Sequence, residues 1–245
     1  MNVEQNFLTF SLFSGAESGF GHFSAAHMGH LLLILAISAG FCLLYRRSAE
    51  RQRRTLRLLT ACGNTALALL RAVLLMAAGQ YGVERLPLHL CGMAVYICLL
   101  HALRPGRLTA QFLLAFCMPG ALAAILFPDW TASAPWSVMS VFNFAIHALI
   151  VAYVLMQLAA GDIRREPCLL PACLGIMLLI AAPVYVFNLA AGTNFMFLSY
   201  PAPDSPLELF AFLGRPGYVL GYLPMIAAVW AVIYLPKRAR IDRKP

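Results

Sequence analysis

The chain has 245 residues, of which 61% are hydrophobic and 11% are charged. Because a soluble domain carries about 25% charged residues, this composition excludes an ordinary water-soluble enzyme and indicates a membrane protein. The formal net charge of +8 does not indicate a nucleic-acid-binding protein, since the basic residues lie in short segments between apolar runs. The seven cysteines include no CxxC pair, so neither a disulfide framework nor a zinc site is predicted.

Seven apolar runs follow one another along the sequence. At a rise of about 1.5 Å per residue, each can cross a bilayer core of about 30 Å. The runs are residues 28–45, 57–79, 86–103, 108–127, 138–159, 169–190 and 216–235. We therefore expect an all-α polytopic membrane bundle that forms a single transmembrane domain over residues 1–245. Pro87 is expected at the start of the third helix, where its missing N–H would have no partner anyway.

The basic residues predict how the bundle is oriented. Fifteen of the 18 Lys and Arg residues follow the first, third and fifth runs or lie in the tail 236–245. By the positive-inside rule, these clusters share the cytoplasmic side only if seven segments cross the membrane. We therefore expect residues 1–27 outside, the tail 236–245 in the cytoplasm, and a multi-pass protein of the inner cell membrane. The first 21 residues contain no Lys or Arg and are not expected to be a signal peptide.

Two outer connections differ in character. Residues 192–215 form the longest connection and are rich in aromatic side chains. Because long ordered loops are often functional, we expect this segment to cap the outer mouth of the bundle. The shorter connection, residues 128–136, carries Trp130 and Trp136, which suit a membrane–water interface.

Polar side chains inside the predicted spans gather in the outer half of the membrane. Such groups are costly in lipid and usually face a cavity or the bundle interior. We therefore expect one polar cavity that opens outward beneath residues 192–215. The residues that share this depth are His27, His30, Arg71, His89, Cys91, Asn143, His147 and Asn188.

Arg71 is the costliest of these groups. It lies roughly 12 Å below the outer end of its predicted helix, at about 1.5 Å per residue, and no Asp or Glu lies in any span. Arg71 either extends to water or to a helix-end carbonyl, or it binds an anion such as a lipid phosphate. The predicted substrate-binding residues are Arg71, His27, His30, Asn188 and Asn194.

His147 is the best candidate for a general base. Asn143 lies one turn away on the same face, so its amide could orient the imidazole, although the pair could also provide interhelical hydrogen bonds alone. His89 and Cys91 would lie about 200° apart on a helix, so they are not expected to face one substrate together. Cys91 shares an apolar strip with Cys98, which favours packing over reactivity. The predicted catalytic residues are His147, Cys91, His89 and Asn143.

Three motifs carry a resemblance to a known family. They are Leu-Pro-Leu-His-Leu-Cys at residues 86–91, Phe-Ala-Ile-His at residues 144–147, and Asn-Phe-Met-Phe-Leu at residues 194–198. Together they resemble the YwaF family of bacterial integral membrane proteins over about residues 20–235. The chain departs from that pattern at residues 215–218, where relatives tend to carry Trp-Pro-Trp-Tyr.

The YwaF family is itself similar in fold to a mammalian transmembrane cysteine acyltransferase that remodels ether phospholipids. It is more distantly similar to the androgen-induced-protein lipid hydrolases, which pair a threonine with a histidine. The resemblance implies that His147 is the membrane-embedded base. In the acyltransferase the nucleophilic cysteine is expected directly before the third-span histidine, where this chain has Leu88. Cys91 instead lies two residues after His89.

Three functions remain open at this point. The first is a lipid-directed acyltransferase or hydrolase in which Cys91, or a hydroxyl such as that of Thr65, attacks, His147 accepts the proton and Arg71 binds an anionic group. The second is a non-enzymatic lipid- or anion-binding or transport protein. The third, a haem or metal protein, is disfavoured because the histidines differ in depth. We expect no cofactor or metal, no nucleic acid, and membrane lipids as partners.

Overall fold

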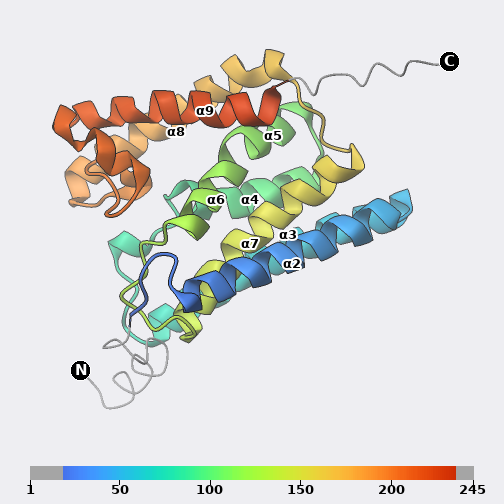
Figure 1. Cartoon of the computed structure of the whole chain (residues 1–245), viewed down its shortest axis with the longest axis horizontal. Coiled ribbons are helices and arrows are strands. Elements are labelled where there is room, and N and C mark those ends of the chain that lie inside the picture. The colour runs from blue at the N-terminus through green and yellow to red at the C-terminus, as the bar shows by residue number, and fades with distance from the viewer. Residues whose placement is uncertain (1–18, 236–245) are drawn as a thin grey trace.

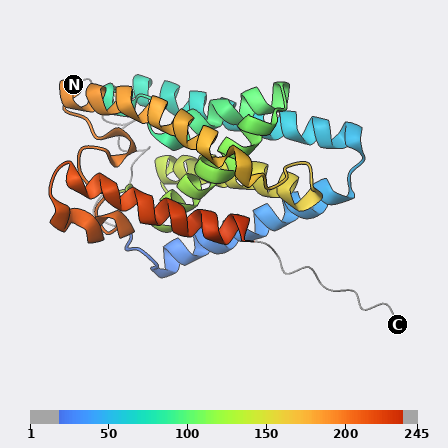
Figure 2. The ribbon, with the colours of Figure 1, turned by 90° about the horizontal axis from the view of Figure 1, so that it is seen from above.

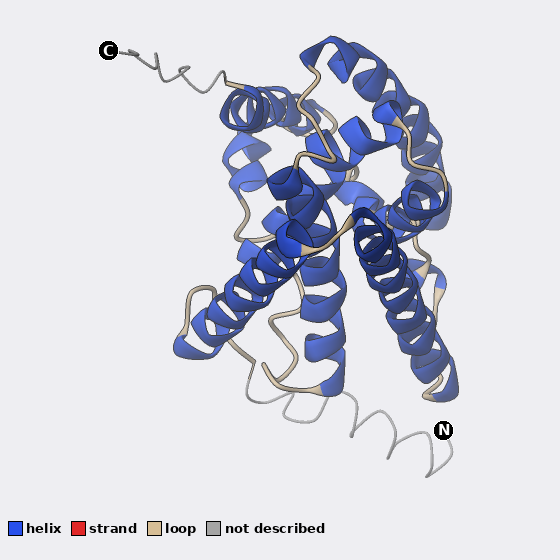
Figure 3. Ribbon diagram, turned by 90° about the vertical axis from the view of Figure 1, so that its right-hand side faces the viewer, coloured by secondary structure: helices blue, strands red, loops and turns tan. Residues whose placement is uncertain are grey.

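The computed structural model describes residues 19–235, and in that part of the chain the regular structure is entirely helical (Figures 1 and 3). The α-helices are α2 (Ala25–Arg47), α3 (Glu50–Ala77), α4 (Leu90–Leu103), α5 (Arg107–Phe112), α6 (Met118–Leu126), α7 (Val138–Ala160), α8 (Leu170–Ala191) and α9 (Tyr222–Tyr234). The short elements are η1 (Val83–Arg85), the π-helical turn η2 (Leu113–Cys117), η3 (Pro167–Leu169), η4 (Phe195–Phe197), η5 (Pro206–Leu213) and η6 (Gly217–Gly221). The predictions for residues 1–18 and for the tail 236–245 lie outside the described residues.

Six helical segments in this part of the chain are long and apolar enough to cross a membrane. They are Ala25–Arg47, Glu50–Ala77, Arg107–Leu126, Val138–Ala160, Pro167–Ala191 and Gly217–Tyr234. The prediction of an all-helical, multi-pass membrane protein is therefore confirmed. Seven spanning helices are not confirmed, because the run predicted at residues 86–103 contains only the 14-residue helix α4, which is about 21 Å long.

Helix α4 begins later than its sequence indicates. His89 is the N-cap residue, with an extended backbone (φ −68°, ψ 149°), and Leu88 N–H bonds to Leu86 O at 2.8 Å. Pro87 therefore lies in a turn before the helix, and the prediction that it opens the helix is wrong. The turn packs so closely on Gly92 that a Cβ there would lie 3.0 Å from the Pro87 Cα. Since His89 is not helical, the helical angle expected between His89 and Cys91 does not apply.

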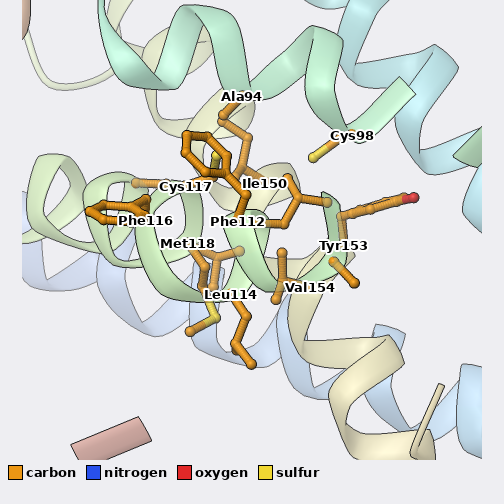
Figure 4. Packing of buried hydrophobic residues seen from close by; sticks show 14 of the residues in the cluster. Ala94, Cys98, Phe112, Leu114, Phe116, Cys117, Met118, Ile150, Tyr153 and Val154 are labelled. Atoms are coloured by element: carbon orange, nitrogen blue, oxygen red, sulfur yellow. The ribbon is translucent and has the colours of Figure 1, made fainter. Parts of the chain in front are cut away.

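Helix α7 is the central element of the bundle. It contacts α2, α3, α4 and α6 (Figure 1), and its middle is almost wholly buried. Ile150 and Val154 of α7 have no exposed surface and belong, with Leu114 of η2, to the main apolar cluster (Figure 4). The groups on α7 are therefore held by neighbours on several sides, which suits a site that needs fixed geometry.

A proline explains the irregular helix formed by α5, η2 and α6. Pro119 has no N–H, so it cannot donate to the carbonyl oxygen of Ala115 four residues earlier. Trp230 of α9 donates its Nε1–H to that oxygen at 3.1 Å. The bond satisfies a carbonyl that lipid could not, and it attaches α9 to the interior of the bundle.

A compact ionic network closes the end of the bundle where α2, α3 and α7 meet. Asp162, just after α7, accepts hydrogen bonds from Tyr45 Oη at 2.6 Å and from Arg53 at 3.1 Å. Arg57 lies 3.5 Å from the same carboxylate. Two of the arginines predicted on the cytoplasmic side thus have a structural role.

The segment between α8 and α9 folds back over one end of the molecule (Figure 2). Asn188 on α8 holds it, since its Oδ1 accepts from the N–H of Phe195 and the hydroxyl of Thr193, both at 2.8 Å. Tyr218 and Tyr222 donate their hydroxyls to the carbonyls of residues 197 and 196, at 2.7 and 2.9 Å. Residues 192–215 therefore form an ordered layer and not a loose linker; this layer is called the cap below.

Candidate functional site

The core of the candidate site is a thiol beside an imidazole. Cys91 lies in the first turn of α4, and its side chain interacts with that of His147 on α7. The His147 Nδ1–H donates to the backbone carbonyl of Asn143 at 2.7 Å. In the neutral ring this bond leaves the lone pair on Nε2, an atom that is buried and has no well-aligned hydrogen-bond partner among the described residues. The arrangement provides a proton acceptor next to a nucleophile.

Asn143 contributes two groups, and their roles differ from the predicted one. Its backbone carbonyl, and not its amide, orients His147. Its side-chain Oδ1 accepts a hydrogen bond of 2.5 Å from the guanidinium of Arg71 on α3. One residue of α7 therefore fixes both the imidazole and the arginine.

Arg71 has no direct ion-pair partner among the described residues. Asn143 is neutral, and none of the ion pairs within residues 19–235 includes Arg71. Only part of the guanidinium bonds to Asn143, so the other N–H groups can receive an anion. A planar guanidinium is well suited to two oxygens of one phosphate or carboxylate.

Asp129 is a member of the site that the sequence analysis missed. Its carboxylate interacts electrostatically with Arg71, His89, Cys91 and His147. Asp129 lies outside the predicted spans, in the connection between α6 and α7, so helix rise did not predict its depth. Its only signal was its position as the sole acidic residue of that short aromatic connection.

His89 joins the site to the cap. Its Nδ1 accepts the N–H of Met196 at 3.2 Å, and its ring packs on Phe195 and Phe197 with centroids 5.2 and 5.4 Å apart. A cavity of about 270 Å³ opens beside it. The cavity is lined by Glu84, His89, Asp129, Thr193, Asn194, Phe195, Phe197, Tyr200 and Pro203.

Asn188 and Asn194 use their amides within the cap. Asn188 completes its bonds by donating Nδ2 to the Phe195 carbonyl at 2.9 Å. Asn194 accepts from the N–H groups of Ser199 and Tyr200 and donates to the Tyr200 carbonyl. Asn194 lines the cavity, but both asparagines act first as supports of the cap.

His27 and His30 lie in a different environment from the Cys91–His147 pair. Their Nε2 atoms pair with the carbonyl oxygens of Ile125 and Pro135 at 2.8 and 2.7 Å. The His27 Nδ1 accepts the N–H of residue 23 at 2.9 Å. The structure therefore brings together Arg71, His89, Cys91, Asn143 and His147. It uses His27 to attach α2 to the end of α6 and His30 to attach α2 to the connection between α6 and α7.

Trp130 is the second group that the sequence analysis did not place in the site. Its indole stacks on the His147 ring, with centroids 5.3 Å apart and planes 28° apart. Its Nε1 is buried and has no hydrogen-bond partner in the described chain. Within residues 19–235, no group of three His, Cys, Asp or Glu side chains is arranged to hold a metal ion.

Comparison with known proteins adds a family to this geometry. The sequence profile of the TMEM164 family matches residues 22–234. No curated protein and no solved structure matches the chain.

Proposed function

Because that match covers most of its length, the chain belongs to the TMEM164 family, and we propose that it is a membrane-embedded acyltransferase acting on phospholipids. The observation that carries the proposal is the Cys91–His147 pair, in which a free imidazole nitrogen lies beside a thiol. The resemblance of the chain to the YwaF family, and through it to a cysteine acyltransferase of ether phospholipids, supports the same chemistry. Cys91 is the nucleophile in this proposal even though it follows His89.

The first half-reaction loads the acyl chain. The Cys91 thiol gives its proton to His147 Nε2, and the thiolate attacks the ester carbonyl carbon of a phospholipid. The sulfur–carbon bond forms, the bond from that carbon to the glycerol oxygen breaks, and His147 returns the proton to the glycerol oxygen. The products are a thioester on Cys91 and a lysophospholipid.

The second half-reaction decides between transfer and hydrolysis. A hydroxyl group of an acceptor lysophospholipid attacks the thioester and gives its proton to His147. The carbon–sulfur bond breaks, and the proton returns to the departing thiolate. Water in place of the acceptor would give a free fatty acid. The cap and the apolar surroundings of the site favour transfer, because they limit the access of water.

Arg71 is the phosphate-binding residue in this mechanism. Its guanidinium is fixed by Asn143 and has no acidic partner among the ion pairs of residues 19–235. An anionic headgroup would relieve the cost of its burial. The same feature favours a second candidate, a protein that binds or transports an anionic lipid without acylating Cys91.

The orientation follows from the basic residues. The capped end, with Arg71 and His147, faces outside, and the Asp162 end faces the cytoplasm of a cell with the protein in its inner membrane. Helix α4 and the turn before it together form the seventh crossing. Reporter fusions at the two termini test this part, since an outward-facing reporter at the C-terminus contradicts it.

The experiment that tests the activity uses purified protein in nanodiscs with a phospholipid that carries a labelled acyl chain and an unlabelled lysophospholipid acceptor. Wild-type protein is expected to form a hydroxylamine-sensitive adduct at Cys91 and to label the acceptor. Cys91→Ala and His147→Ala are expected to lose both signals. Cys62→Ala, which removes an exposed thiol of α3, is the matched control.

Two outcomes contradict the enzyme. Labelled acceptor formed at the wild-type rate by His147→Ala excludes the general base. Phospholipid binding that depends on Arg71, without turnover by the wild type, replaces the acyltransferase with the binding protein.

A further inference from the structure

The connection between α6 and α7 lies against the base of the proposed reaction. Trp130 stacks on His147 at 5.3 Å and meets Phe144 edge-on, with centroids 5.2 Å apart and planes 79° apart. Two aromatic contacts at nearly perpendicular planes fix the indole in position and in plane. The ring can therefore present a group to the site with little freedom.

The group it presents is an N–H without an acceptor. Nε1 of Trp130 is buried, and no described atom accepts its hydrogen bond. A buried donor without a partner is costly, and an indole nitrogen can only donate. The same region holds a second buried atom of this kind, the Nε2 of His147. The His147 atom is an acceptor that lies beside the Cys91 thiol, whereas the Trp130 N–H is a donor that lacks an acceptor, as expected where the carbonyl oxygen of an ester binds.

Hydrogen bonds to its carbonyl oxygens hold the connection that carries Trp130. The N–H of Phe20 bonds to Thr131 O at 3.0 Å, and His22 Nε2 lies 3.2 Å from Pro128 O. His30 reaches Pro135 O at the far side of the connection. Residues 128–135 are thus anchored before and after Trp130, so its N–H is preorganised and does not need a loop movement to reach its place.

We propose that Trp130 is a catalytic hydrogen-bond donor, whose Nε1–H binds the acyl carbonyl oxygen as Cys91 attacks. This inference rests on the proposed acyltransferase function. When the sulfur–carbon bond forms, the carbonyl π electrons move to oxygen, and the negative charge on that oxygen is stabilised by the indole N–H. When the carbon–oxygen bond of the leaving group breaks, the electrons return and the hydrogen bond weakens. In this arrangement the Arg71 guanidinium binds the phosphate of the lipid and not the carbonyl oxygen.

The matched pair of variants is Trp130→Phe and Trp136→Phe. Trp136 lies in the same connection and packs on His30 at a tilt, with ring centroids 4.0 Å apart, outside the reacting groups. A phenylalanine at position 130 keeps an aromatic ring against His147 and removes the N–H, together with some ring area. Two rates are measured. The first is acyl transfer to the lysophospholipid. The second is methylthiolation of Cys91 by methyl methanethiolsulfonate, which is monitored by mass spectrometry of the peptide that contains Cys91.

We expect Trp130→Phe to lower acyl transfer by about 10²- to 10³-fold, the usual effect of losing one such donor. Methylthiolation of Cys91, and its pH profile, are expected to stay within about twofold of wild type, since that reaction develops no charge on a carbonyl oxygen. Trp136→Phe is expected to leave both rates unchanged.

Each alternative outcome contradicts the inference in a recognisable way. Equal losses in both rates, or a shifted pH profile of methylthiolation, would mean that Trp130 acts only by supporting His147. Unchanged acyl transfer in Trp130→Phe would mean that the N–H does not bind the reacting oxygen, while the acyltransferase itself stands. A wild type without any acyl transfer overturns the proposed function, and this inference with it.

Discussion

The bond between Trp230 and the freed carbonyl of Ala115 allows a prediction that is independent of function. Trp230→Phe keeps an aromatic ring beside Phe116, whose centroid lies 5.5 Å from that of Trp230. It removes the Nε1–H that bonds to Ala115 O at 3.1 Å. In an apolar bundle no water replaces that donor, so the carbonyl is left unsatisfied.

The expected cost is about 1–3 kcal/mol for the unsatisfied carbonyl, with a further loss of roughly 0.5 kcal/mol for the smaller ring. The cost arises because position 119 is a proline. Pro119→Ala restores an N–H that can donate to Ala115 O. In that background Trp230→Phe should therefore cost only about 0.5 kcal/mol, the area term.

A double-mutant cycle measures this difference. Unfolding free energies of the wild type, the two single variants and the double variant are measured in one detergent by reversible denaturation. A coupling energy of about 1 kcal/mol or more is expected. If Trp230→Phe costs the same in both backgrounds, the proline does not free the carbonyl that the indole binds, and the explanation given for the α5–η2–α6 irregularity is wrong.

Three further predictions follow from single interactions. Asn188→Leu leaves the N–H and carbonyl of Phe195 without partners, so hydrogen exchange and proteolysis of residues 192–215 should increase while the α7 core stays protected. Asp162→Asn leaves two partly buried arginines of α3 without their anion and should lower stability by about 1–2 kcal/mol in detergent unfolding, less than a fully buried pair. The Arg107 guanidinium holds the pKa of Glu166 below its usual range, so their pair stabilises the fold above the ordinary glutamate pKa of about 4.3. That contribution is lost as the pH falls through the lowered pKa. In Glu166→Gln, the melting temperature should therefore fall less steeply with decreasing pH in this acidic range than it does in the wild type.

Depth along the helices was predictable from the sequence. Arg71, Asn143 and His147 share a level because a helix advances by a fixed rise for each residue, and the structure links all three through Asn143. The bonding atoms were not predictable in the same way. Whether the amide or the carbonyl of Asn143 meets the imidazole depends on the rotamer that packing with α3 selects.

The start of α4 shows a second limit. A proline before an apolar run is compatible both with a first helical turn and with a turn outside the helix. The close packing of Pro87 on Gly92 belongs to the second arrangement, and it moved His89 out of the helix. The angular spacing of residues on a helix therefore could not predict that Cys91 and His89 belong to one site.

By itself, the sequence determined the membrane environment and the helical class, since hydrophobicity and rise per residue are local properties of the chain. The tertiary structure decided which polar groups meet. Depth supplies one coordinate of a side chain, whereas a site also needs the rotation of each helix and the path of each connection. Asp129 and Trp130 lie between helices, where no periodicity applies. They reach His147 because residues 20–30, far away in sequence, hold the connection in place.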